Sequence, residues 1–475
     1  MFTPTGRTAL SEEAQLPVDP SAPPASPTEP SPAWTLAACF LGMFVVTLDA
    51  VVVNVALPHI RTDLGGGLAG LQWVVDGYTL TVAALLLSAG ALSNRVGAHR
   101  AFALGMAGFG AASVACGVAP TLPLLVAARV AQGAFAALLM PTSMALIGQA
   151  YTDPVRRARA VGYWALGGAV AFSAGPVVGG ALSEWTWRAI FLVNVPVALL
   201  ALWLVRRAPA SPRRRHPFDT AGLGLAIVAM GALTWAAIES GSAGVTSPPV
   251  LAMFALAVAA GTGLWLLERR VAHPMLPPAL FAAPAVSAAS FVGFVFMACF
   301  YGTPFVMSLE LQQQRGLSSL ATGLAFLPMM LIGLLLTPLS ARMVERFGRR
   351  PVMVTGLTVM AAGLVGLGLA PASAPLWHVA GLLLLVGFGG PTIMPPATAA
   401  LLNAVDPSLS GTASGVLNTS RQLGGALAVA VFGALLASAG SFETGRLLSM
   451  LIAAALALLA VIVTTRHLAA TPTDR

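Results

Sequence analysis

The sequence predicts an all-α, polytopic membrane protein with about fourteen transmembrane helices. Of the 475 residues, 57% are apolar and only 9% are charged, whereas an average soluble domain has roughly 25% charged residues. Apolar runs of the length that crosses a bilayer, about 20 residues, recur along the chain. Arginines gather in the short stretches between these runs. This composition argues against a soluble globular enzyme and against a disordered chain.

The order of the elements follows from where the apolar runs fall. Residues 1–33 contain eight prolines and several acids, so a disordered cytoplasmic tail is expected there. The runs that follow are separated by short polar or arginine-rich stretches. The predicted spans are 34–57, 71–93, 100–119, 122–148, 160–183, 189–205, 220–239, 250–267, 284–308, 320–343, 351–370, 375–402, 412–438 and 445–465.

The arginines predict the orientation. The chain contains no lysine, so all 25 basic residues are arginines. With an even number of spans, nineteen arginines lie on the side of both termini, four lie on the opposite side and two lie inside spans. Since positive loops stay inside, both termini are expected in the cytoplasm of a multi-pass protein of the bacterial cell membrane. Basic clusters between apolar runs, without one basic face, argue against nucleic-acid binding.

The chain also carries an internal repeat. Each single match is weak, but three matches at nearly one offset predict two homologous six-span halves in parallel orientation, which is a transporter architecture. The matches are residues 94–97 with 345–348 (offset 251), residues 140–141 with 394–395 (offset 254), and Gly162 with Gly415 (offset 253).

The domain organisation follows from the spans and the repeat, with spans 220–239 and 250–267 as an inserted pair. The expected segments are a tail at 1–33, a six-helix bundle at 34–205, a basic linker with two inserted helices at 206–275, a second six-helix bundle at 276–467 and a cytoplasmic tail at 468–475.

The loop after the second span carries the first family resemblance. Residues 90–100 resemble the cytoplasmic loop signature of the major facilitator superfamily. In that family an acid and an arginine form a charge network that latches the two halves; here Asn94 replaces the acid and supplies no charge. The alternative is that the arginines only anchor the topology. The latch candidates are Gly90, Asn94, Arg95, Gly97 and Arg100.

Two acids lie in the first two spans, in stretches similar to those of fourteen-span drug:proton antiporters. Asp49 belongs to Leu48–Pro58 and Asp76 to Trp73–Tyr78. A carboxylate inside a span is costly unless it is protonated, paired or hydrated. Both are therefore candidates for proton coupling or substrate binding, and they could share one proton. The alternatives are a structural acid for Asp49 and an interfacial acid for Asp76.

Arg129 and Gln132 in the fourth span resemble the R-x-x-Q-G motif of the same family. An arginine inside a span stays charged and needs a partner, for which Asp49 is the first candidate and Asp76 the second. The alternative is a purely structural buried pair.

Residues 175–180 resemble the G-P-x-x-G-G motif, which marks exporters within the superfamily. Proline removes a helix hydrogen bond and the glycines permit close packing, so the residues of interest are Gly175, Pro176, Gly179 and Gly180. Ordinary glycine and proline packing is the alternative. Further matches at 187–196, 218–222 and 411–424 extend the resemblance over about 34–465. Additional candidates for cavity-lining residues are Asn54, Gln132, Asn418, Arg421 and Gln422.

The resemblance implies a proton-coupled multidrug or antibiotic exporter that works by alternating access, with small lipophilic or cationic substrates, protons and the bilayer as its partners. It implies a monomer, no enzymatic activity and no cofactor. No metal-ligand spacing and no phosphate-binding loop with lysine occur in the sequence. Two alternatives stay open: an exporter or symporter of a specific metabolite, such as an amino acid or siderophore, and a non-transporting membrane sensor. The sensor leaves charges inside the membrane unexplained.

Overall fold

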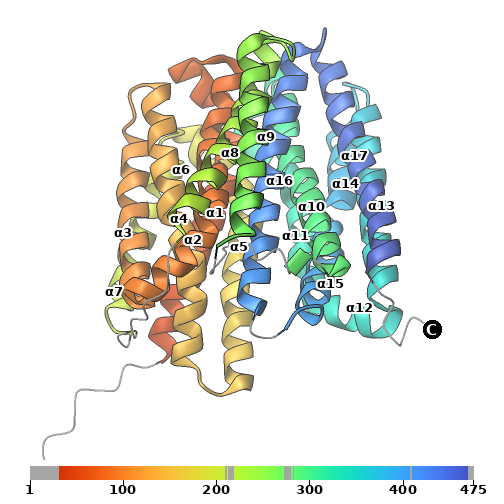
Figure 1. Cartoon of the computed structure of the whole chain (residues 1–475). Coiled ribbons are helices and arrows are strands. Elements are labelled where there is room, and N and C mark those ends of the chain that lie inside the picture. The colour runs from red at the N-terminus through yellow and green to blue at the C-terminus, as the bar shows by residue number, and fades with distance from the viewer. Residues whose placement is uncertain are drawn as a thin grey trace, which may run out of the picture.

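The computed structural model confirms the predicted fold class (Figure 1). It describes residues 32–208, 211, 219–271, 280–281, 283–406 and 409–468. Among these, thirteen helices are long and apolar enough to cross a membrane, and the segment Ala189–Val205 is a shorter apolar helix. The predicted tail at 1–33 and the end of the chain after 468 fall almost wholly outside the described residues, as does most of the basic linker.

The first half of the chain supplies six spans, of which the sixth is broken at Val193 into two short helices. The break leaves Asn194 at the start of the second piece. These helices are α1 (Pro32–Leu64), α2 (Gly67–Val96), α3 (Ala98–Gly117), α4 (Leu122–Ala150), α5 (Pro154–Trp185), α6 (Ala189–Leu192) and α7 (Asn194–Val205).

The second half repeats this plan after the inserted pair α8 (Thr220–Ala243) and α9 (Pro248–Glu268). A π-helical turn extends its first span, and its second span tightens to a 3₁₀ turn before α12. The elements are α10 (Pro284–Leu309), η2 (Glu310–Gln314), α11 (Ser319–Leu336), η3 (Thr337–Leu339), α12 (Ser340–Phe347), α13 (Arg349–Leu369), α14 (Leu376–Gly387), α15 (Gly389–Asn403), α16 (Ser410–Ser438) and α17 (Phe442–His467).

Helix packing supports the internal repeat. α1 packs on α5 in the first half as α10 packs on α16 in the second, and α3 packs on α4 as α13 packs on α14. The loops agree: Gly97 and Gly348, which are 251 residues apart, each connect two helices with a positive φ, of 96° and 82°. Glycine adopts this conformation without the steric cost that a Cβ would add. The repeat read from short motifs is therefore also present in the three-dimensional structure.

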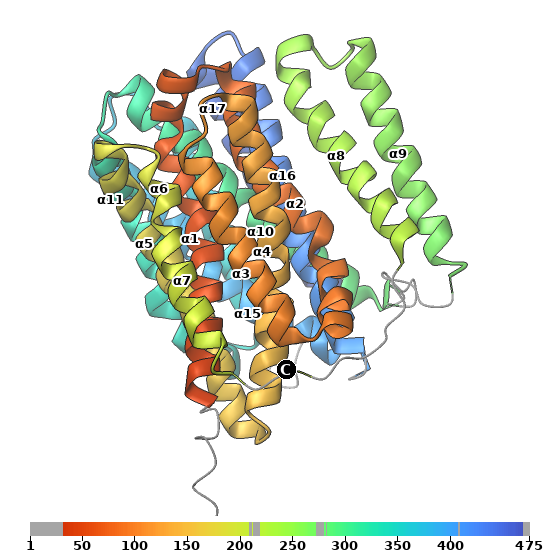
Figure 2. The same cartoon turned by 90° about the vertical axis from the view of Figure 1, so that its left-hand side faces the viewer.

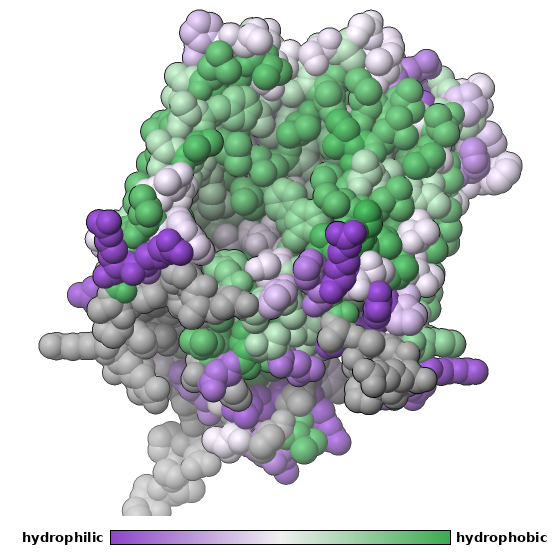
Figure 3. Space-filling view, turned by 45° about the vertical axis from the view of Figure 1, so that its right-hand side comes forward, coloured by the Kyte–Doolittle hydropathy of each residue, from purple (hydrophilic) through white to green (hydrophobic). Residues whose placement is uncertain are grey.

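The two halves meet along two seams, one between α5 and α11 and the other between α2 and α16. Helix α8 packs on both α2 and α16, so it lies along the second seam, while α9 packs mainly on α8 (Figure 2). Most of α9 is exposed, and its exposed residues include Leu251, Leu256 and Val258. Figure 3 shows apolar residues over the middle and upper part of one face and hydrophilic residues toward its lower end. Such a surface suits a bilayer.

Each half carries an ion pair at the end of the bundle opposite to the start of α1. We call the end at which α1 begins and α17 finishes the termini face, and the opposite end the far face. In the first half, Arg188 pairs with Asp63 at 2.5 Å and donates to the carbonyl of Ala119 at 3.4 Å. The pair links the first span, the sixth span and the loop between α3 and α4.

The second half has the equivalent arrangement, more deeply buried. Arg446 donates to Glu310 at 2.8 Å and to the carbonyl of Ala370 at 2.6 Å, and Arg315 adds a second cation to Glu310 at 2.6 Å. Glu310 follows Asp63 by 247 residues and Arg446 follows Arg188 by 258. Arg188, Arg315 and Arg446 are three of the four arginines that the sequence places on the side opposite the termini. The structure places Arg446 within the first turns of α17 and gives each of them a partner.

We predict that Glu310→Gln lowers the stability of the protein, because it leaves two arginines with a neutral partner. Loss of one partner of a buried ion pair costs about 3–5 kcal/mol. Thermal unfolding of the purified protein in detergent, followed by size-exclusion fluorescence, measures the change. The matched control is Asp63→Asn, whose carboxylate is 47% exposed against 3% for Glu310, and which should change stability little. Equal losses in the two variants would contradict this prediction.

Candidate functional site

The centre of the first half is a buried ion pair between Asp49 of α1 and Arg129 of α4. Both side chains have no exposed surface. Arg129 Nη1 donates to Asp49 Oδ2, and Nε donates to the carbonyl of Val74 on α2 at 2.9 Å. A buried pair is tolerated only when further hydrogen bonds satisfy its remaining polar atoms. The surroundings of the pair supply most of them.

Two amides complete the shell around Asp49. Gln132 Nε2 and Asn194 Nδ2 donate to Asp49 Oδ1 at 2.8 and 2.9 Å. Gln132 Oε1 accepts from Arg129 Nη1 at 2.7 Å, and its Nε2 also reaches Ser113 Oγ of α3 at 2.9 Å. The carboxylate is therefore held by one cation and two amides. Helices α1, α2, α3, α4 and α7 all contribute to this network.

Aromatic rings cover the cation. The Arg129 guanidinium lies 4.4 Å from the ring centroid of Tyr78 and 5.6 Å from that of Phe191, which suits a cation–π contact. A Cβ on Gly133 would come within 2.5 Å of the Tyr78 carbonyl, so only glycine lets α4 approach α2 this closely. Each named position of the R-x-x-Q-G motif therefore has a structural reason. Arg129 pairs with Asp49, Gln132 hydrogen-bonds to both members of that pair, and Gly133 lets α4 approach α2.

Asp76 has a different environment. It is fully buried, its Oδ1 accepts from Thr79 Oγ1 at a long 3.4 Å, and its Oδ2 has no hydrogen-bond partner among the described residues. Gln72, one turn earlier on α2, donates to the carbonyls of Val429 and Ala430 on α16. Residues four apart share a helix face, so Asp76 lies on the side of α2 that faces the seam with α16.

The structure does not bring the two acids into contact. Both oxygens of Asp49 are occupied by Arg129, Gln132 and Asn194, whereas the described bond of Asp76 is to Thr79 on its own helix. The expectation that the two carboxylates share one proton therefore finds no hydrogen bond between them in this conformation.

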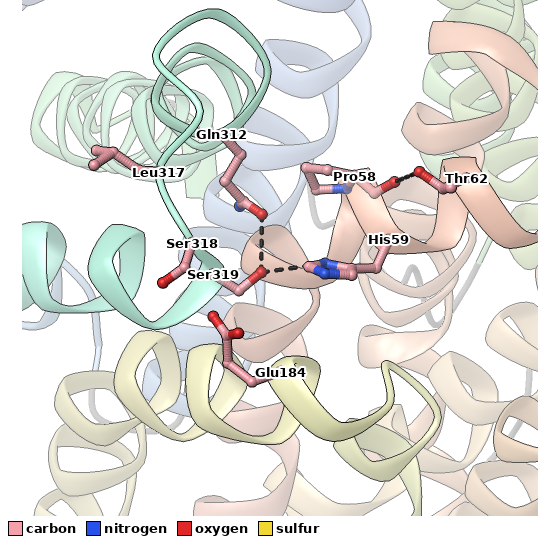
Figure 4. A pocket seen from close by; sticks show the side chains of 8 residues that line it. All are labelled: Pro58, His59, Thr62, Glu184, Gln312, Leu317, Ser318 and Ser319. Atoms are coloured by element: carbon pink, nitrogen blue, oxygen red, sulfur yellow. Dashed lines mark hydrogen bonds between the residues drawn. The ribbon is translucent and has the colours of Figure 1, made fainter.

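Hydrogen bonds between the two halves gather near the far face (Figure 4). Ser308 donates to the carbonyl of Asn54 at 2.7 Å, and Gln312 donates to that of Val55 at 2.9 Å. Ser319 Oγ lies 3.1 Å from His59 Nδ1. These contacts surround a cavity of about 220 Å³, lined by Pro58, His59, Thr62, Glu184, Gln312, Leu317, Ser318 and Ser319.

The glycines of residues 175–180 let α5 pack closely on two neighbours at once. A Cβ on Gly179 would lie 2.7 Å from the Val52 carbonyl of α1, and one on Gly180 would lie 2.6 Å from the carbonyl of Ser319, the first residue of α11. Gly323 of α11 faces the Pro176 carbonyl, where a Cβ would come within 2.1 Å. The motif thus seals the seam between α5 and α11, and Gly323 is a partner that sequence analysis did not identify.

The loop between α2 and α3 contacts its own half. His99 Nε2 lies 2.8 Å from the carbonyl of Val205, and the His99 backbone donates to Ser211 at 3.1 Å. Gly90 packs near Pro141 of α4. Arg95 and Arg100 are exposed and form no ion pair with any described residue. The side chain of Asn94 lies outside the described part of the chain, so the latch remains a prediction.

The remaining cavity candidates divide between two places. Asn54 is buried at the contact between α1 and α10. Asn418, Arg421 and Gln422 lie on α16, where they are half-buried. Arg421 Nη1 donates to Asn418 Oδ1 at 3.1 Å, and Arg421 Nε is buried with no partner within the described ranges.

Sequence analysis missed Asn194 and the cluster around Glu310. Asn194 lies within the matched stretch 187–196, and its role depends on the helix break at Val193, for which Pro196 is the local signal because it cannot donate to the carbonyl of Leu192. An acid directly after an apolar run, near the repeat offset from Asp63, could have identified Glu310. Within the described ranges, no group of three or more His, Cys, Asp or Glu side chains is placed to hold a metal ion.

Comparison with known proteins agrees with the fold and the motifs. The family model described as Major Facilitator Superfamily matches residues 39–293 and 289–475. The methylenomycin A resistance protein of Streptomyces coelicolor is 37% identical over 412 residues, which cover 86% of this chain and 87% of that protein. The multidrug resistance protein Stp of Mycobacterium tuberculosis is 36% identical, covering 85% of this chain and 76% of its own length.

Among solved structures, the inward open conformation of the xylose transporter XylE from E. coli superposes with a TM-score of 0.64 at 18% identity, covering 93% of this chain and 97% of that one. At this identity the likeness concerns the fold alone. The family model spans nearly the whole chain, and the curated relatives exceed a third in identity over most of it. The chain therefore belongs to the Major Facilitator Superfamily.

Proposed function

We propose that this protein exports small lipophilic antibiotics or drugs from a bacterial cell in exchange for protons, by alternating access. Relatives named as methylenomycin A and multidrug resistance proteins support drug export. The charges deep in the membrane support coupling to protons, because such groups mark ion and proton pathways. Nineteen arginines on the side of the termini support a cytoplasmic position for the termini face.

The observation that carries this proposal is the unequal environment of two acids in one half. Asp49 is bound by a cation and two amides, which stabilise its charged form. Among the described residues, Asp76 has one long hydrogen bond and a buried oxygen without a partner, so its charged form lacks compensation. We assign the proton to Asp76 and a structural and coupling role to the Asp49–Arg129 pair.

The position of Asp76 suits a coupling group. It lies at the seam between α2 and α16, which must change if the halves rock about a central site. A proton taken up from outside neutralises Asp76 and lets the empty carrier return to the cytoplasm-facing state. Inward movement of one charge supplies about 2.3 kcal/mol per 100 mV of membrane potential. Substrate export can then proceed against its gradient.

We predict that Asp76→Asn abolishes proton-driven efflux while the protein still folds, because a neutral amide cannot take up and release a proton. The assay uses inverted vesicles whose lumen has been acidified, so that a pH-sensitive dye is quenched. Addition of substrate to a coupled exporter releases protons from the lumen and restores the dye fluorescence. Resistance in an efflux-deficient host, with and without an uncoupler, gives a second readout.

The matched control is Glu443→Gln, an exposed acid at the start of α17, which should leave efflux unchanged. Full proton-driven efflux by Asp76→Asn would overturn the assignment of the proton to this residue.

We further predict that Asp49→Asn and Arg129→Gln each reduce the amount of folded protein, since each leaves one buried charge unpaired, at about 3–5 kcal/mol. The double variant removes both charges and should regain part of that loss. A double-mutant cycle on thermal unfolding measures the coupling between them. Additive losses would show that the pair does not stabilise the fold.

A further inference from the structure

Arg421 differs from the other arginine well inside a span in having no carboxylate partner among the described residues. Arg129 is paired with Asp49, whereas the described hydrogen bond of Arg421 is to the neutral amide of Asn418 on its own helix. Its Nε is buried and has no hydrogen-bond partner in the part of the chain that the structure describes. A guanidinium keeps its charge in a protein, so Arg421 is a cation inside the bundle with unused donors.

The packing around Arg421 is built to admit its side chain. On α10, Gly293 leaves the space through which the stem passes, because a Cβ there would lie 3.2 Å from Arg421 Cγ. All residues from Asn418 to Leu423 are half-buried, although they lie in the middle part of α16. Neighbouring helices therefore cover this stretch incompletely, and Arg421 keeps part of its surface exposed although its Nε is buried.

An aromatic cluster lies next to the cation. Tyr301 of α10 packs on Gly425, one turn along α16 from Arg421. Phe300 stacks on Phe296 with ring centroids 5.0 Å apart, and Phe172 of the first half lies 4.9 Å from Phe300. The cluster thus bridges the two halves at mid-depth, beside the hydrogen bond from Ser173 to the Met330 carbonyl.

These features together define a chemical class of substrate. Flat aromatic walls bind an apolar or aromatic body, and a few placed polar groups fix its orientation. An unpaired guanidinium prefers a carboxylate, which it can bind through two parallel N–H···O bonds. We propose that the substrate is an organic anion: a lipophilic compound with a carboxylate that binds Arg421 while its body lies against Phe172, Phe296, Phe300 and Tyr301.

This inference rests on the proposed export function and changes the expected substrate from lipophilic or cationic to lipophilic and anionic. It also separates two tasks in space. The proton is assigned to Asp76 on α2, in the first half, and the substrate carboxylate to Arg421 on α16, in the second half.

The test is direct binding to the purified full-length protein in lipid nanodiscs, with three matched probes: 2-naphthoate, its neutral methyl ester and 2-naphthylmethylammonium. Calorimetry should find that 2-naphthoate binds about tenfold or more tightly than the cation. Arg421→Gln should weaken 2-naphthoate binding by about tenfold to a hundredfold and change ester binding less than about twofold. Arg421→Lys should retain part of the affinity, because lysine keeps the positive charge but cannot offer two parallel N–H donors to one carboxylate.

The control variant is Arg342→Gln, which removes an exposed arginine of α12 and should change none of the affinities. Thermal unfolding of each variant confirms that it is folded. The proposal is overturned if the wild type binds the ester or the cation as tightly as the carboxylate. It is equally overturned if folded Arg421→Gln binds 2-naphthoate like the wild type.

Transport separates this inference from the proposed function. If 2-naphthoate binds through Arg421 but a proton gradient drives efflux of no compound in the resistance panel, the export function fails and the anion site stands. If proton-driven efflux is confirmed for neutral or cationic compounds alone and persists in Arg421→Gln, the anion site fails and the export function stands.

Discussion

The burial of one ion pair governs the organisation of the first half. Asp49 and Arg129 have no access to water, so neighbouring helices must supply the hydrogen bonds that water would give. That requirement fixes where α1, α2, α3, α4 and α7 approach one another. The second half has no acid and no arginine at the corresponding positions: the residues 251 after Asp49 and 254 after Arg129 are Phe300 and Leu383. The duplicated architecture thus carries this charged pair in one half only, and the other half has apolar side chains at the two corresponding positions.

Both halves keep an ion pair at the far face, even though their cores have diverged. The pairs of Asp63 with Arg188 and of Glu310 with Arg446 tie the first and last span of each half to the loop between its third and fourth spans. A half that is tied in this way can move as one body. The seams between the halves rely instead on glycine contacts and on hydrogen bonds to backbone carbonyls, which can break and reform without separating an ion pair.

Much of this structure could be predicted from sequence, because membrane spans are long, apolar and separated by arginines. The pairing of Arg129 could be anticipated too, since a cation inside a span needs an acid. The helix face on which Asp76 lies could not: α2 is apolar on most sides, so its sequence does not show which face meets α16. The break at Val193 had a local signal in Pro196, which cannot donate to the carbonyl of Leu192, although both pieces are apolar and read as one span.

The inserted helix α8 has a consequence for how compounds reach the interior. It covers the seam of α2 and α16 on one side, where Gly241 lets it lie against Ala434 at close range. The opposite seam, of α5 and α11, has no inserted helix packed on it among the described elements. The protein is therefore sided within the plane of the membrane. A molecule dissolved in the lipid therefore meets an inserted helix at one seam and a close glycine-packed contact of two helices at the other, so the two lateral approaches to the interior are not equivalent.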